Sequence, residues 1–141
     1  MQGKKFISPG AWFSINYPSD WNEFEDGEGS FLFYNPDVWT GNFRISAFKG
    51  NAGYGKEAIR LELKENDSAS LVKIGTWDCA YSKEMFQEEG TYYTSHLWIT
   101  GTGNIAFECS FTVPKGGSTK EAEEVIATLE ARKEGEKYPA E

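Results

Sequence analysis

The chain has 141 residues, of which 39% are hydrophobic and 16% are aromatic. That length fits one domain, and the aromatic share is enough to build a sizeable core from large rings. The formal net charge of −8 produces a field that repels phosphate backbones and anionic lipid. The composition therefore argues against nucleic acids and membrane surfaces as partners. A basic protein or a cation suits this charge better, although an acidic balance most often serves only solubility.

The two cysteines, Cys79 and Cys109, are too few for a disulfide scaffold and lack the spacing of metal ligands. Both lie among apolar residues of predicted strands, where a reduced thiol behaves as a small hydrophobic side chain. The start of the chain has no continuous apolar segment of the signal-peptide kind, and no stretch approaches the roughly 20 apolar residues that span a bilayer. We therefore expect a cytoplasmic protein without a disulfide or a membrane span. A leader that has been removed is the alternative.

Three strands are predicted in the first third of the chain. Apolar residues alternate with polar ones over residues 13–17, and Pro18 ends the run because proline cannot donate to a ladder. Residues 30–35 and 42–49 are similar runs, and a hairpin loop over 36–41 joins them. The three runs predict an antiparallel meander.

The segment 53–67 carries two patterns at once. Its isoleucine and leucines alternate as in a strand, but Tyr54, Ala58 and Leu61 share one helical face, and the segment is rich in strong helix formers. We predict a helix here, with a strand as the alternative.

The second half of the chain is rich in strands. Residues 71–86 predict one long strand, bent or bulged at Gly75, and residues 91–100 and 104–113 predict a hairpin. Bulky residues lie on both faces of the 91–100 strand, which favours a sheet covered on both sides, with one helix on each.

A final helix is predicted from Ser118, where Glu121 completes a capping box. The helix carries an apolar stripe made of Ala122, Val125, Ile126 and Leu129. The charged residues 134–141 are expected to fray, so the predicted domain spans residues 1–133. The predicted class is α+β, an α/β/α sandwich around a mainly antiparallel sheet of about six strands with a C-terminal helix.

Two segments resemble PsbP-like domains. The first, FSINYPSDW (13–21), is a strand that ends in tyrosine-proline and is followed by Trp21; the second, TSHLWITGTGNIAFECSFTVPKGG (94–117), is a hairpin that leads into the last helix. This superfamily includes the photosystem extrinsic protein, a yeast nuclear-transport factor that binds Ran, and uncharacterised bacterial domains, which the chain resembles most. The resemblance implies an α/β/α sandwich and no catalytic residue. We expect Trp21 to pack over the sheet edge.

Residues 50–57, GNAGYGKE, have the glycine and lysine spacing of a phosphate-binding P-loop between a strand and a predicted helix. However, Glu57 follows Lys56 where a hydroxyl should hold Mg²⁺, and the predicted sheet is antiparallel. A glycine-rich turn is therefore the preferred interpretation. A small-molecule or nucleotide-binding enzyme that uses Gly50 to Lys56 is the alternative function.

Other residues that could carry chemistry lack the necessary pattern. The acidic stretch 23–28 offers oxygen ligands but not the alternation of a calcium loop, so a solvated turn is expected. His96 has no partner that the sequence defines, and Cys109 lies on an apolar strand face. We predict no catalytic residue, no metal site and no cofactor.

Trp39 lies in a loop where no local pattern demands burial, and exposed rings in loops are typical of binding sites. A lid folded back on the core is the alternative for this residue. The predicted partner-binding residues form two competing surfaces, the loop with Tyr34, Asp37, Trp39 and Asn42 and the strand face with Tyr92, His96 and Trp98. The predicted function is that of a non-enzymatic binding or adaptor domain that engages a protein partner.

Overall fold

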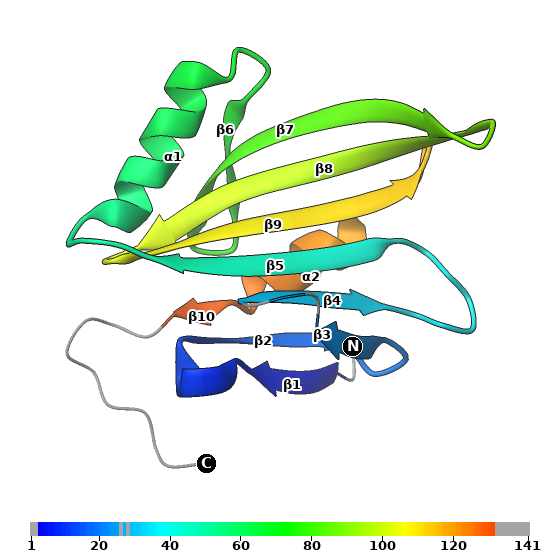
Figure 1. Ribbon diagram of the computed structural model, residues 1–141, viewed down its shortest axis with the longest axis horizontal. Coiled ribbons are helices and arrows are strands. Elements are labelled where there is room, and N and C mark those ends of the chain that lie inside the picture. The colour runs from blue at the N-terminus through cyan, green and yellow to red at the C-terminus, as the bar shows by residue number, and fades with distance from the viewer. Residues whose placement is uncertain (1–2, 26, 28, 132–141) are drawn as a thin grey trace.

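The computed structural model describes residues 3–25, 27 and 29–131. Ten strands, two α-helices and one short 3-10 helix follow one another along these residues (Figure 1). In chain order they are β1 (Gly3–Ile7), η1 (Pro9–Ala11), β2 (Phe13–Pro18), β3 (Asn22–Glu25), β4 (Ser30–Tyr34), β5 (Asn42–Lys49), α1 (Tyr54–Glu65), β6 (Ser70–Ile74), β7 (Trp77–Glu88), β8 (Thr91–Thr102), β9 (Ile105–Pro114), α2 (Lys120–Ala127) and β10 (Glu130–Ala131).

The strands form two antiparallel sheets rather than one. A seven-stranded sheet has the order β3-β4-β5-β9-β8-β7-β6, and a three-stranded sheet has the order β1-β2-β10. Two helices accompany these sheets, so the α+β class is confirmed. The predicted number of about six strands is too low, because several edge strands are short.

The predicted meander is only partly correct. β4 and β5 pair as expected, with Phe33 opposite Phe43, but β2 leaves this sheet and pairs with β1 and β10. The sequence does not predict β1 and β3. Phe6 is the only buried residue of β1 and all of β3 is exposed, so neither strand shows the apolar alternation from which strands are recognised.

The long strand predicted over residues 71–86 is in fact a hairpin. Gly75 has a φ of +60°, and β7 turns back on β6 so that Ile74 lies opposite Trp77. A bend was expected at this glycine, but the positive φ that glycine adopts without strain permits a full reversal of the chain.

Both predicted helices are present. α1 fills most of the segment 53–67, so the helix is confirmed against the strand alternative. The capping box at Ser118 is wrong, because α2 begins at Lys120 and the Ser118 Oγ accepts a hydrogen bond from the Lys120 amide at 3.0 Å. Thr119 Oγ1 instead donates to Glu123 at 2.5 Å.

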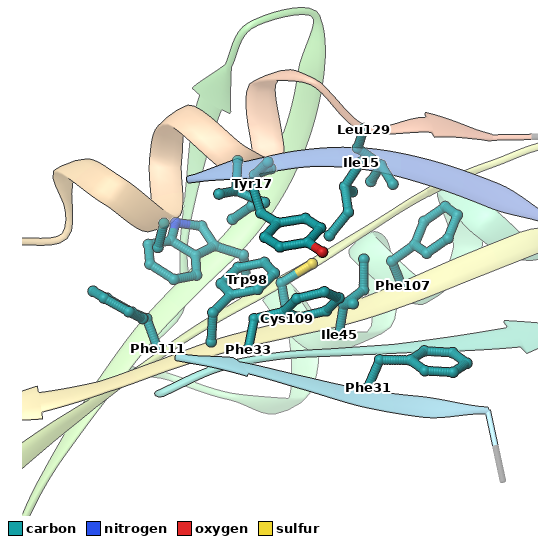
Figure 2. Close-up of a cluster of buried hydrophobic side chains, with 14 of the residues drawn as sticks. Ile15, Tyr17, Phe31, Phe33, Ile45, Trp98, Phe107, Cys109, Phe111 and Leu129 are labelled. Atoms are coloured by element: carbon teal, nitrogen blue, oxygen red, sulfur yellow. The ribbon is translucent and has the colours of Figure 1, made fainter. Parts of the chain in front are cut away.

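The core lies between the two sheets (Figure 2). β2 and α2 lie on one side of it, and β4, β5 and β9 lie on the other. The Tyr17 ring of β2 packs against Phe33 of β4 with their centroids 4.9 Å apart. α2 adds Ala122, Val125 and Ile126, all of which are fully buried. Burial of large rings from both layers is what holds the sheets together.

The two helices pack on different parts of the seven-stranded sheet. α1 contacts β7, β8 and β9, whereas α2 contacts β2, β6 and β9. Along β8 the side chains alternate, so that His96 and Trp98 face the core while Tyr93 and Leu97 face the other way. Figure 1 shows α1 over one end of β7, β8 and β9; neither described helix covers the other end, toward the β7–β8 hairpin. We call this uncovered surface the open face.

Candidate functional site

The loop between β4 and β5 is fixed by Asn35. Its Oδ1 accepts hydrogen bonds from the amides of Asp37 and Val38 at 2.9 and 3.0 Å, and its Nδ2 donates to Asp20 at 3.2 Å. Asn35 is itself buried, so the loop has a defined shape. Asp20, which lies in the turn after β2, thereby anchors this loop.

Trp39 projects from this loop toward the β7–β8 hairpin. Its Nε1 donates to Asn42 Oδ1 at 2.7 Å, and its ring meets the Tyr93 ring edge to face, with centroids 6.3 Å apart and planes at 76°. The Phe86 ring stacks on the Tyr93 ring, with their centroids 5.5 Å apart. Trp39 remains 40% exposed, so it is not a lid on the core.

These rings line a hollow of about 420 Å³ on the open face. We call it the aromatic hollow and define it by Trp39, Asn42, Phe86, Glu88, Glu89 and Tyr93. Phe86 and Tyr93 lie opposite each other in the β7–β8 register, so their side chains emerge on the same face of the sheet. The hollow therefore combines three aromatic rings, one amide and two carboxylates.

A second, more polar hollow of about 550 Å³ adjoins it toward the end of α1. Its lining includes the hydroxyls of Ser82, Ser95 and Ser110 and the carboxylates of Glu84 and Glu108. Thr112, which borders the aromatic hollow, donates to Ser95 Oγ at 3.5 Å, so the two hollows meet across β9 and β8.

The structure separates the other predicted loop residues from the aromatic hollow. Tyr34 stacks on Phe24 of β3 with centroids 4.6 Å apart. Asp37 contributes its amide to the Asn35 turn and does not line the hollow. Of the predicted loop residues, the structure therefore brings Trp39 and Asn42 together.

The predicted strand face of Tyr92, His96 and Trp98 does not form one surface. Trp98 is 2% exposed and His96 is 8% exposed, because β8 is an interior strand between β9 and β7 and this face turns toward the core. Only Tyr92 is exposed, and Lys115 lies over its ring at 5.7 Å. The prediction of Trp98 as a surface residue is wrong.

His96 has a partner that the sequence did not reveal. Its Nδ1 lies 2.6 Å from the Tyr81 hydroxyl, and its ring packs with those of Tyr81 and Trp98 in a cluster of three rings, with centroids 5.9 and 6.1 Å from that of His96. Burial, followed by the nearby charge of Lys83, lowers the pKa of His96 below its usual value. A neutral imidazole can accept a hydrogen bond from the Tyr81 hydroxyl at Nδ1, so this group is a satisfied part of the core.

The two thiols are free and buried, which agrees with the expectation of no disulfide. Burial raises the pKa of Cys79 to about 11, and it raises the pKa of Cys109 further. Because the thiolate is the nucleophilic form, neither thiol is poised to react near neutral pH.

The P-loop spacing is explained by packing. The amides of Gly50 and Gly55 donate to the carbonyls of Asn104 and Gly103 at 2.8 and 3.0 Å. A Cβ on Gly55 would lie 2.3 Å from the Thr102 nitrogen, so glycine is needed where α1 crosses the β8–β9 turn. Amides that would face a phosphate are thus already bonded within the fold.

The remaining acidic and terminal predictions are only partly described. Glu23 and Glu25 are exposed on β3, while Asp26, Glu28 and the predicted tail 134–141 lie outside the described residues. Within residues 3–25, 27 and 29–131, no group of three potential metal ligands is found. In that same part of the chain, no helix is both long and apolar enough to cross a membrane.

Phe86, Glu88, Glu89 and Tyr93 were not predicted as site residues. Tyr93 lies on the face of β8 opposite Tyr92, as strand alternation predicts, but nothing in one sequence says which face of an interior strand is open. The one available signal was the two-residue turn Glu89–Gly90, which fixes Phe86 opposite Tyr93 once the hairpin is recognised.

The whole chain, residues 1–141, matches a family described as "Domain of unknown function (DUF3805)", and it belongs to that family. It is similar to a crystal structure from Bacteroides thetaiotaomicron VPI-5482, with 96% sequence identity and a TM-score of 0.96. The match covers 100% of this chain and 53% of that one, so the chain spans about half the length of the solved protein. A comparison with curated proteins gives no match.

Proposed function

We propose that this chain is a non-enzymatic binding or adaptor domain that engages a protein partner through the aromatic hollow. The observation that carries the proposal is the set of three partly exposed rings, Trp39, Phe86 and Tyr93, gathered on a sheet face that α1 leaves open. Exposed aromatic side chains held rigidly beside polar groups are typical of interface hot spots.

The geometry elsewhere supports a binding role over the enzymatic alternative. The Gly50 and Gly55 amides are bonded to backbone carbonyls, so a phosphate would have to break these bonds to gain them. His96 is buried and hydrogen-bonded to Tyr81. These contacts leave the Gly50 to Lys56 loop poorly suited to a nucleotide.

Native capture tests the proposal. The chain is immobilised and exposed to a Bacteroides thetaiotaomicron lysate, in parallel with a Trp39→Ala bait and a Phe48→Ala bait. Phe48 is a matched control, because it is an aromatic residue 45% exposed at the opposite end of β5 from Asn42. We expect a protein that is retained by the wild-type and Phe48→Ala baits and lost from the Trp39→Ala bait. Equal capture by all three baits, or by none, contradicts the proposal.

A nucleotide panel tests the alternative function. A nucleotide at a hundredfold excess over its dissociation constant would stabilise the fold by about 2.7 kcal/mol. We expect no such shift in the melting temperature. A shift that disappears in Lys56→Ala would instead support a nucleotide-binding enzyme.

We also infer a PsbP-like sandwich as the distant relationship of this fold. The strand-to-tryptophan opening at residues 13–21 and the β8–β9 hairpin that leads into α2 support it. Superposition on a solved PsbP-like domain tests this inference, which fails if β4 to β9 and the two helices do not align together.

A further inference from the structure

The aromatic hollow has a charge as well as a shape. Glu88 and Glu89 line it beside the rings, and no basic residue of the described chain does so. Neither carboxylate makes an ion pair with another described residue. Three rings with two uncompensated carboxylates form an environment that favours a cation, because the ring faces and the carboxylates attract the same charge.

The position of Glu89 is unusual for its residue type. Glu89 has a φ of +50° and Gly90 a φ of +81°, the combination required at the two central positions of a type I′ hairpin turn. Asparagine, aspartate or glycine normally occupies the first of these positions, since other side chains are strained there. The glutamate at this position places a carboxylate at the rim of the hollow, although its backbone conformation makes the turn less stable than an asparagine or glycine would.

We propose that the aromatic hollow receives an arginine side chain of the protein partner. A guanidinium is planar, so it can stack on an aromatic ring while its N–H groups donate to Glu88 and Glu89. An ammonium offers a point charge without the flat surface, so a lysine should bind less well. The chain's net charge of −8 favours the approach of a basic segment. This inference rests on the proposed function and specifies its partner.

The adjoining polar hollow gives the arginine-bearing segment a path. The Thr112 to Ser95 hydrogen bond joins the two hollows, and the hydroxyls and carboxylates beyond it can bond an extended main chain. The partner segment would therefore lie across β9, β8 and β7, with its arginine at the hairpin end.

A single-arginine peptide tests the proposal on the intact chain. Acetyl-Gly-Ser-Arg-Ser-Gly-amide is titrated to millimolar concentration while the indole N–H resonance of Trp39 is followed by NMR; Trp39→Phe assigns this signal among the five tryptophans. The controls replace the arginine by citrulline, its neutral isostere, and by lysine. We expect a saturable shift with arginine, a severalfold weaker one with lysine, and at least tenfold weaker binding with citrulline. Equal binding of the citrulline peptide, or no shift with arginine, overturns the proposal.

Charge variants sharpen the test. The double variant Glu88→Gln, Glu89→Gln should bind the arginine peptide at least tenfold more weakly than the wild type. Glu130 is an exposed glutamate on β10 in the other sheet, so Glu130→Gln should leave the affinity unchanged. A neutral glucan such as maltoheptaose that shifts the Trp39 signal when the arginine peptide does not would assign the hollow to carbohydrate and overturn the proposal. If native capture depends on Trp39 but the peptide does not bind, this inference fails and the proposed function stands.

Discussion

Two aromatic clusters on the seven-stranded sheet have similar chemistry and different surroundings. Trp21 packs against Phe43 and Phe111, with ring centroids 6.2 and 6.1 Å away, and is 0% exposed. Trp39 contacts Tyr93 at a similar 6.3 Å but stays 40% exposed. The first cluster faces the second sheet, and the second cluster is on the open face. The sheet face, and not the residue type, decides which rings hold the fold and which are free to bind.

Truncation of the core tryptophan should have the largest effect. Trp21→Ala removes a fully buried ring, so it should lower the free energy of unfolding by about 3–5 kcal/mol. Trp21→Phe is the control: it keeps most of the packing and removes an indole N–H that has no hydrogen-bond partner among the described residues. Chemical denaturation measures both. A loss below about 1 kcal/mol for Trp21→Ala would contradict the assignment of Trp21 to the core, because surface changes cost that little.

The helix crossing gives the next effect. A Cβ at Gly55 would collide with backbone atoms of Thr102 and Ile105, so Gly55→Ala should cost about 1–3 kcal/mol through overpacking. The neighbouring Lys56 is exposed, so Lys56→Ala should stay within about 0.5 kcal/mol of the wild type. Denaturation midpoints compare the two variants. A larger loss of stability for Lys56→Ala than for Gly55→Ala would contradict the explanation of the P-loop spacing by packing.

Glu89→Asn should increase stability. Asparagine tolerates the positive φ of this turn position better than glutamate, so the free energy of unfolding should rise by up to about 1 kcal/mol. Glu89→Gln, which removes the charge but keeps an unfavourable side chain at that φ, separates the backbone effect from charge repulsion. If Glu89→Asn raises the free energy of unfolding no more than Glu89→Gln does, the turn is not strained.

Acid should destabilise the core face through His96. Burial holds its pKa below the usual value in the folded state, with Lys83 lowering it further and Glu123 partly opposing this. The unfolded chain therefore binds this proton first as the pH falls below about 6.5, and stability drops from that pH until the folded-state pKa is passed. His96 is the only histidine of the chain, so His96→Gln should flatten this part of the profile. An unchanged profile in that variant would assign the drop to carboxylates.

Local patterns predicted the longer elements of the fold and missed its division into two sheets. α1 follows from its strong helix formers, β5 and β9 follow from the alternation of apolar residues on one face, and β8 follows from the hairpin that it forms with β9. The transfer of β2 to the second sheet depends on its pairing with β1 and β10, which are short or largely exposed. Pairing between distant strands leaves little local signal.

The candidate site was predicted less completely than the fold. Trp39 and Asn42 were identified because they lie in or directly beside the loop between β4 and β5, where exposure is expected. Tyr93 and Phe86 lie in strands, where an aromatic residue is normally assigned to packing. Their exposure follows from where α1 ends on the sheet, a tertiary fact that no local pattern contains.

Chemical denaturation and partner binding of one variant together test the central claim that the aromatic hollow is a recognition surface rather than part of the core. Trp39→Ala is compared with the wild type and with Phe48→Ala. We predict a change in the free energy of unfolding within about 0.5 kcal/mol, as for other surface substitutions, together with the loss of at least about 2 kcal/mol of partner binding. A loss of about 3–5 kcal/mol in folding stability, equal to that of Trp21→Ala, would make Trp39 part of the core and contradict the account.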